Sequence, residues 1–381
     1  GGAVRTTVCI GRSVGAGDKK QAAKVIGNTV TLFMVGSVVL AAALVGLVDP
    51  IVRLISTPEE AVTGTTAYLT ICFIGIPCIT AYNVLASIFR GMGDSQSPMY
   101  FIAAACVVNI GLDFFFMGAL RLGPAGAALG TTLSQAVSVL LALCVILKRK
   151  SIRLSKSDFC PRKATMKDIL SIGLPVAAQD GFIQVSFMLI TIMANQRGLT
   201  DAAAVGIVEK IISFLFLVPS SMLSTVSALG AQNIGAGKYD RVDKILRYAI
   251  AIGVGFGAVM ALLMQFIAPS VVRPFTSDEA VVKAGAAYIR SYIFDCLFAG
   301  IQFSFSGYFC AWGRSGLSFL HNTLSILLVR VPGAWLACRF FPQTLVPMGL
   351  APACGSLFSS IVCVLLYRWM KRQNKPTGDK D

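Results

Sequence analysis

Ten apolar runs, each long enough to cross a lipid bilayer, dominate this chain. They cover approximately residues 27–48, 64–89, 98–120, 124–147, 169–195, 201–229, 245–267, 284–310, 317–338 and 347–369, after an apolar stub at 1–11. A spanning helix needs about 20 predominantly apolar residues, whereas the strands of a membrane barrel have about ten residues of alternating polarity. Because the runs are long and continuously apolar, the sequence predicts an all-α polytopic membrane protein.

The distribution of positive charge predicts an orientation. The formal net charge of +15 would indicate nucleic-acid binding only if the basic residues gathered on one folded surface. Instead, 23 Lys and Arg residues fall on the same side as the basic segment 148–168, and 6 fall on the other. Positive residues favour the cytoplasmic side, so we expect this segment and the C-terminus to be cytoplasmic. Contact with anionic membrane lipids accounts for the charge, and no nucleic-acid partner is expected.

Three short motifs recur in the same order with an offset of about 220 residues. Residues 13–18 (SVGAGD) match 233–238 (NIGAGK), 57–62 (TPEEAV) match 276–281 (TSDEAV), and 89–93 (FRGMG) match 309–313 (FCAWG). The matches predict two homologous helical lobes. Both copies of the first motif lie in predicted cytoplasmic loops, so the repeats are expected to run parallel, related by an axis along the membrane normal.

The repeat also predicts the domain boundaries. We expect a first lobe at 1–147, a cytoplasmic basic linker at 148–168, a second lobe at 169–370 and a cytoplasmic tail at 371–381. About 64 residues of the second lobe precede its first motif, but only 12 residues precede the matching motif in the first lobe. Two six-helix bundles are therefore expected, with the first helix and most of the second absent from the first bundle.

Reactive side chains give little support for an enzyme. None of the 11 cysteines forms a CxxC pair, and His321 is the single histidine. The chain has no HExxH motif. We expect neither an enzyme nor a cofactor.

Several stretches together resemble the multidrug and toxic compound extrusion (MATE) family of bacterial antiporters. They are 15–18 (GAGD), 89–94 (FRGMGD), 109–113 (NIGLD), 124–128 (PAGAA), 218–219 (VP) and 231–238 (AQNIGAGK). The resemblance implies two bundles that face each other across a cavity. It also implies alternating access, in which inward Na⁺ or H⁺ flow drives export of drug-like, mostly cationic lipophilic compounds. A monomer in the cell membrane is expected. Known members carry an acid on the first helix, which this sequence lacks.

Asp113 is the strongest candidate for binding the coupling ion, because ionisable residues inside a membrane are costly and usually functional. Asn109 lies four residues earlier, on the same helix face. At about 1.5 Å rise per residue, Asp113 lies roughly 8 Å from the outer end of its helix and Thr131 roughly 10 Å into the next. A carboxylate, an amide and a hydroxyl at one depth suit Na⁺ or a shared proton. In the resembled family the matching positions form the first-lobe cation site. The alternative is a carboxylate satisfied by neighbouring helices without an ion.

Five residues of the second lobe are expected to line the substrate cavity. By the same rise, Asp180 and Glu209 lie near the middle of the membrane, and so does Asp295. Gln179 adds an amide, and Arg330 either neutralises an acid or extends toward the headgroups. Buried hydrogen bonds between helices are the alternative role for the acids.

Other functions fit the sequence less well. A lipid-linked oligosaccharide flippase of the same superfamily is the main alternative, but a pyrophosphate substrate would be expected to need a cationic cavity. The acids inside the predicted spans outnumber the cations Arg330 and Lys210. A passive channel would not require the two-lobe repeat.

Overall fold

The computed structural model describes residues 2–54, 59–149 and 155–373. These residues form α-, 3₁₀- and π-helices without any strand, which confirms the prediction of an all-α fold. Ten helices in this part are long and apolar enough to cross a membrane. Parts of the predicted linker (150–154) and tail (374–381) and residues 57–58 of one repeated motif lie outside the described residues.

The chain divides into two compact units, which we call the first unit and the second unit. The first unit is Arg5–Leu170, and the second is Ser171–Asp381 together with Gly1–Val4. The boundary between Leu170 and Ser171 falls inside helix α7 (Lys163–Asn195), so the first turns of this helix group with the first unit.

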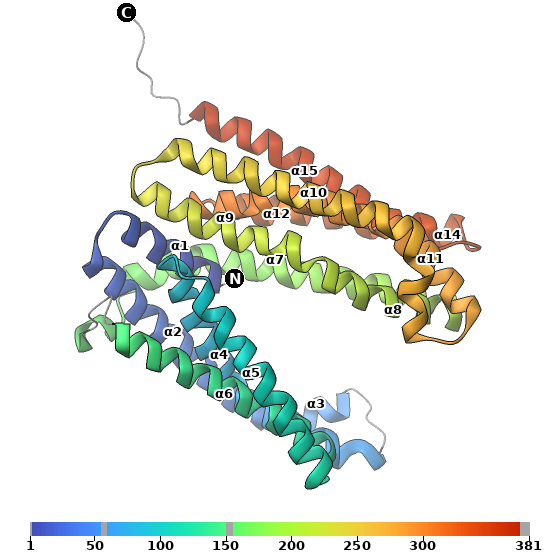
Figure 1. Ribbon diagram of the computed structural model, residues 1–381, viewed down its shortest axis with the longest axis horizontal. Coiled ribbons are helices and arrows are strands. Elements are labelled where there is room, and N and C mark those ends of the chain that lie inside the picture. The colour runs from blue at the N-terminus through green and yellow to red at the C-terminus, as the bar shows by residue number, and fades with distance from the viewer. Residues whose placement is uncertain (1, 55–58, 150–154, 374–381) are drawn as a thin grey trace, which may run out of the picture. The chain divides into compact units, whose positions relative to one another are not determined.

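The first unit is a bundle in which α4 and α6 pack against each other, α2 packs on α4, and α5 packs on α6 (Figure 1). Its core contains Phe89 and Phe101, whose rings meet edge to face at 5.4 Å between centroids. The helices are α1 (Gly2–Gly15), α2 (Lys19–Gly46), α3 (Val48–Leu54), α4 (Glu59–Gly91), α5 (Gln96–Asp113), the π-helical segment η1 (Phe114–Ala119), α6 (Gly123–Arg149) and the short 3₁₀ segment η2 (Lys156–Phe159).

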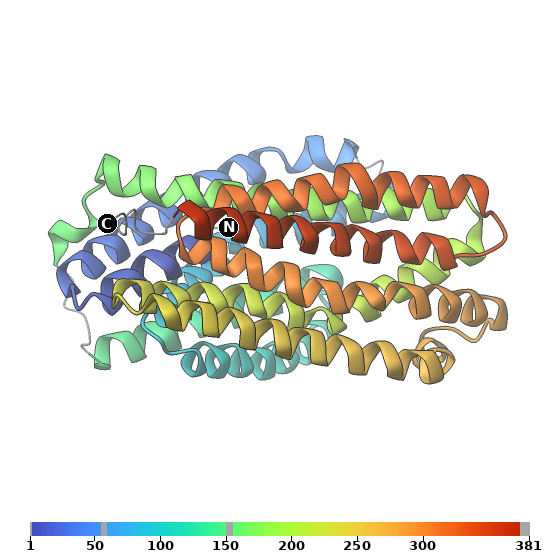
Figure 2. The same ribbon diagram turned by 90° about the horizontal axis from the view of Figure 1, so that it is seen from above.

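In the second unit α12 is central and packs against α9, α10 and α15, which run alongside it (Figures 1 and 2). Gly253 and Gly300 let α10 and α12 approach closely, because a Cβ on Gly253 would lie 2.9 Å from the Gly300 Cα. After α7, the helices are α8 (Leu199–Leu215), α9 (Leu217–Gly235), α10 (Tyr239–Val272), the 3₁₀ segment η3 (Arg273–Phe275), α11 (Glu279–Tyr292), α12 (Phe294–Ala311), α13 (Ser315–Ser325), the π-helical segment η4 (Ile326–Arg330), α14 (Val331–Phe340) and α15 (Val346–Gln373).

Proline explains why the span Leu199–Gly235 is broken between α8 and α9. Pro219 has no N–H and cannot donate to the carbonyl of Leu215 four residues earlier. That carbonyl accepts instead from the Cys296 thiol, at 3.8 Å. Within a membrane such a freed carbonyl needs a partner from a neighbouring helix, and here α12 provides it.

The repeated motifs adopt the same turn in both units. Gly17 and Gly237 have positive φ angles of 73° and 71°. The N–H of Asp18 donates to the carbonyl of Ser13, and that of Lys238 donates to Asn233 in the same way. Each is the six-residue closure that ends a helix when a glycine follows in the left-handed conformation. The sequence repeat is therefore a structural repeat.

The segment around η2 is attached to α2 through Asn28, whose side chain is fully buried. The Asn28 Nδ2 donates to the Asp158 carbonyl at 3.1 Å, and its Oδ1 accepts from the Arg162 N–H at 2.8 Å. Gly27 allows this approach, because any Cβ there would collide with the Asp158 backbone. The Ser155 backbone N–H and hydroxyl both donate to Asp158 and hold the pKa of its carboxyl below the ordinary value. We call residues 155–162 the strap.

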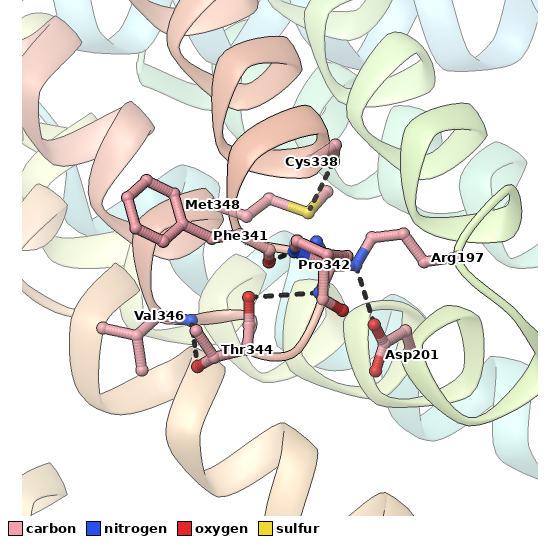
Figure 3. Close-up of polar contacts among 8 residues, drawn as sticks. All are labelled: Arg197, Asp201, Cys338, Phe341, Pro342, Thr344, Val346 and Met348. Atoms are coloured by element: carbon pink, nitrogen blue, oxygen red, sulfur yellow. Dashed lines mark hydrogen bonds and ion pairs between the residues drawn. The ribbon is translucent and has the colours of Figure 1, made fainter.

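Arg197 joins two loops at one end of the second unit (Figure 3). Its Nε donates to Asp201 at 2.8 Å. Its remaining nitrogens donate to the carbonyls of Phe341, Pro342 and Thr344 at 2.9–3.1 Å. One planar guanidinium thus connects the α7–α8 turn to the α14–α15 loop, a geometry that a lysine cannot reproduce.

Candidate ion-coupling and substrate sites

The structure brings Asn109 and Asp113 together on α5. The Asn109 Nδ2 donates to the Asp113 Oδ1 at 3.4 Å, and both side chains are partly exposed. Asp113 is the last residue of α5, directly before η1, where the Leu120 N–H reaches back five residues to Phe115. Such π-helical turns often occur at functional sites.

Gly130 on α6 is the position against which the Asp113 carboxylate packs. A Cβ at Gly130 would overlap the Asp113 Oδ1 and lie 3.5 Å from the Asn109 Nδ2. Its neighbour Thr131 is exposed and makes no hydrogen bond to Asp113 in the part of the chain that the structure describes. The Asp113 carboxylate and the Asn109 amide, both predicted for the site, therefore lie together against α6. The Thr131 hydroxyl follows Gly130 in the sequence but does not bond to either of them in the described structure.

A hollow beside Asp113 is open to the surroundings of the first unit. Its volume is about 460 Å³, and its lining is mainly apolar apart from the carboxylate; the lining residues are Ile110, Asp113, Phe114, Met117 and Gly118. No group of three or more His, Cys, Asp or Glu side chains suited to a metal ion occurs among residues 2–54, 59–149 and 155–373. Any ion at Asp113 would thus rely on neutral oxygen ligands in addition to one carboxylate.

In the second unit, Glu209 on α8 is held by α7. The Thr191 hydroxyl lies 3.2 Å from both carboxylate oxygens of Glu209. Gln179 and Asp180, although adjacent, lie on different faces of α7. Gln179 is buried and accepts from the Ser318 hydroxyl at 2.8 Å, whereas Asp180 is exposed.

Asp295 and Arg330 are both buried inside the second unit, at 0% and 8% exposure. The Arg330 guanidinium donates to the Tyr292 hydroxyl at 2.9 Å and lies 4.7 Å from the centre of the Phe187 ring. Asp295 and Glu209 are both close enough to Arg330 to interact with it electrostatically. The structure therefore groups Glu209, Asp295 and Arg330, while Gln179 and Asp180 have other surroundings.

Comparisons with known proteins agree with this architecture. The sequence model of the MatE family matches residues 1–115 and 175–336. The chain is 30% identical over 367 residues to YpnP of Bacillus subtilis, a probable multidrug resistance protein, with 96% of this chain and 81% of the relative covered. This chain belongs to the MATE family.

Other MATE proteins are similar over most of the chain. NorM of Thermotoga maritima, also a probable multidrug resistance protein, is 23% identical over 96% of this chain and 80% of its own length. A crystal structure of MATE in complex with MaL6 has a TM-score of 0.92 at 22% identity, covering 98% of this chain and 84% of the other. An outward-facing MATE multidrug resistance transporter has a TM-score of 0.91 at 23% identity, covering 99% and 84%. The protein is thus a multi-pass membrane transporter of a multidrug efflux family, in which the members are not enzymes.

Sequence reasoning about this MATE chain missed the partners of the charged residues. Thr191, Tyr292 and Phe187 contact Glu209 or Arg330, but nothing in their local sequence distinguishes them. It also gave no role to His321, which is buried between the Ser306 and Ser359 hydroxyls at 3.0 and 2.7 Å. The one available signal was a polar residue inside an apolar run, which says nothing about the partner.

Proposed function

We propose that this MATE protein exports small, mostly cationic lipophilic compounds across the bacterial cell membrane in exchange for inward Na⁺ or H⁺. The names of its relatives, which include multidrug resistance and multidrug export proteins, support this substrate class. We further propose that it acts as a monomer among membrane lipids, with its C-terminus in the cytoplasm. No cofactor is needed apart from the coupling ion.

The Asp113–Asn109 pair against Gly130 is the observation that carries the proposal. A lone carboxylate inside a membrane span is costly unless it binds a proton or a cation. The Asn109 amide supplies an oxygen ligand of the kind that hard cations prefer. Thr131, which follows Gly130 on the facing helix, is the third proposed ligand.

Antiport then follows if the ion and the drug each stabilise a different conformational state, open to opposite sides of the membrane. A ligand shifts a conformational equilibrium only by its difference in affinity between the two states. We propose that the ion bound at Asp113 favours the state open to one side and the drug the state open to the other. Each lobe would move as one body during the exchange.

Substitution of Asp113 tests the coupling. In cells expressing the protein, Asp113→Asn should abolish ion-driven efflux of cationic dyes while leaving the amount of protein in the membrane unchanged. Efflux is measured with and without a Na⁺ gradient and with an uncoupler, which also identifies the ion. Asp49→Asn, an exposed acid of the same unit, is the matched control and should transport normally. Normal coupled efflux by the Asp113→Asn protein would refute the site.

For the substrate, Asp180 is the proposed recognition group. This residue is exposed, in contrast to the buried Asp295 and Arg330. Accessible carboxylates favour cationic over neutral compounds. A flippase for pyrophosphate-linked lipids would be expected to expose basic groups instead, and so we do not favour it.

A further inference from the structure

A positive charge lies deep inside the second unit with few partners. Arg330 is 8% exposed, and one of its nitrogens donates to the Tyr292 hydroxyl. Its Nε is buried without a hydrogen-bond partner among the described residues, and its face lies over the Phe187 ring. Phenol and ring contacts leave most of the donor capacity of a guanidinium unused. The charge must therefore be balanced mainly by nearby acids.

Asp295 is the acid best suited to balance it. This residue is completely buried, and neither carboxylate oxygen accepts a hydrogen bond of normal geometry within the described residues, although Ser356 lies nearby. Each buried ion that is left unpaired costs several kcal/mol. Arg330 and Asp295 are each incompletely satisfied and lie within electrostatic range of one another, which offsets part of this cost.

Glu209 completes the cluster from a third direction. Asp295 comes from α12, Glu209 from α8 and Arg330 from η4. The Thr191 hydroxyl is the hydrogen-bond donor that Glu209 has in the described structure. Two carboxylates beside a hydroxyl form the kind of all-oxygen set that would otherwise attract a free cation.

The repeat relates Arg330 to the ion site of the first unit. With an offset of 220 residues, Arg330 corresponds to Ile110, three residues or about one helical turn before Asp113. Both charged residues lie at π-helical segments, η1 and η4. Both also pack on a glycine of a later helix: Asp113 on Gly130 of α6, and Arg330 on Gly355 of α15, where a Cβ would lie 3.2 Å from the Arg330 Cβ. At related places the two units thus carry opposite charges.

We propose that Arg330 is a tethered cation that permanently occupies the acid site of the second unit, formed by Asp295 and Glu209. A free Na⁺ ion is then excluded from that site, and ion coupling is confined to Asp113 in the first unit. This inference rests on the proposed antiport function for its biological meaning. The pairing itself concerns only the second unit and is measurable without transport.

Thermal unfolding of the purified protein tests the proposal in an Asp113→Asn background, which removes the first-unit site. Midpoints are compared in NaCl and in choline chloride of equal ionic strength. With Arg330 present, the two salts should give the same midpoint. In Arg330→Gln, Asp295 and Glu209 are vacant, and Na⁺ should raise the midpoint by about 3 °C or more. Arg330→Lys keeps the cation and should again show no preference for Na⁺.

The double variant Arg330→Gln/Asp295→Asn separates ion replacement from misfolding. Arg330→Gln and Asp295→Asn should each lower the midpoint or the yield, and the double variant should recover most of the loss. A double variant no better than Arg330→Gln would overturn the pairing. If the double variant recovers its midpoint but Na⁺ does not raise the midpoint of Arg330→Gln, the pair is purely structural. That result would overturn the proposal that Arg330 takes the place of a bound cation. The proposed antiport function is tested separately, by efflux from cells expressing the Asp113→Asn protein. Its failure is therefore distinguishable from both unfolding results.

Discussion

At the scale of single residues, some loops of the second unit are held in place by one side chain that makes several hydrogen bonds. Arg197 is the clearest case, with one carboxylate and three carbonyl acceptors around a side chain that is 7% exposed. Hydrogen bonds from a charged donor are stronger than neutral ones, and an acceptor left without its donor loses more than the bond itself. The loop that follows α14 depends on this one group.

Replacement of Arg197 should therefore be costly. We expect Arg197→Ala to lower the free energy of unfolding by about 2–4 kcal/mol. Arg197→Lys should lower the free energy of unfolding by most of that amount, since an ammonium group cannot reach the same acceptors. Arg273→Ala is the control: its pair with Glu279 is exposed, and exposed pairs contribute about 0–1 kcal/mol. Thermal unfolding in detergent measures all three, and equal midpoints for Arg197→Ala and Arg273→Ala would contradict the expectation.

At the scale of helices and segments, the strap shows how a polar connection is fixed to a membrane helix. The side-chain amide of Asn28 on α2 donates to the Asp158 carbonyl and accepts from the Arg162 N–H, so it replaces the pairing that a backbone peptide group would make. Both contacts lie within the first unit, which extends to Leu170. Movement between the units is therefore expected to begin beyond the strap, within α7 after Leu170.

Loss of the Asn28 amide should release the strap. In Asn28→Ala the Arg162 N–H and the Asp158 carbonyl lose their partner. This lowers the free energy of local opening by about 1–2 kcal/mol, which corresponds to roughly 5–30-fold faster amide exchange. Hydrogen–deuterium exchange of peptides covering 155–162 measures this. Asn83→Ala provides the comparison, because Asn83 is exposed and its side-chain amide donates to the Ile79 carbonyl of its own helix. Unchanged exchange in Asn28→Ala would show that the strap is held by other contacts.

At the scale of the whole molecule, the charge distribution makes a prediction about topology. The strap lies on the side with 23 basic residues, and the α10–α11 connection lies on the side with 6. An excess of Lys and Arg in short loops favours the cytoplasmic side. Three candidate spans separate these two segments, and an odd number of crossings places them on opposite sides of the membrane.

Cysteine labelling in intact cells tests that orientation. A variant that retains only Cys160, which is an exposed residue of the strap, should react with a membrane-impermeant maleimide only after the cells are opened. Ser277→Cys in a cysteine-free chain should react from outside, because this exposed residue precedes α11 on the opposite side. Labelling of both positions from the same face would overturn the predicted topology.

The sequence by itself determined the features that depend on local regularity. Long apolar runs required helices that satisfy their own backbone groups in lipid. The recurring GAG motifs required the same left-handed turn at Gly17 and Gly237. The four-residue spacing of Asn109 and Asp113 placed them on one face of α5, where they are hydrogen-bonded.

The tertiary structure decided which helix faces meet and at what depth. Glycines that no local pattern distinguishes, Gly130 and Gly355, set the close approaches at Asp113 and Arg330. Depth estimates placed Asp180, Glu209 and Asp295 near one level, but helix packing left Asp180 exposed and enclosed Asp295 with Arg330. The physical reason is that helical periodicity fixes neighbours three or four residues apart, whereas the partner of a buried charge depends on how small residues let separate helices pack.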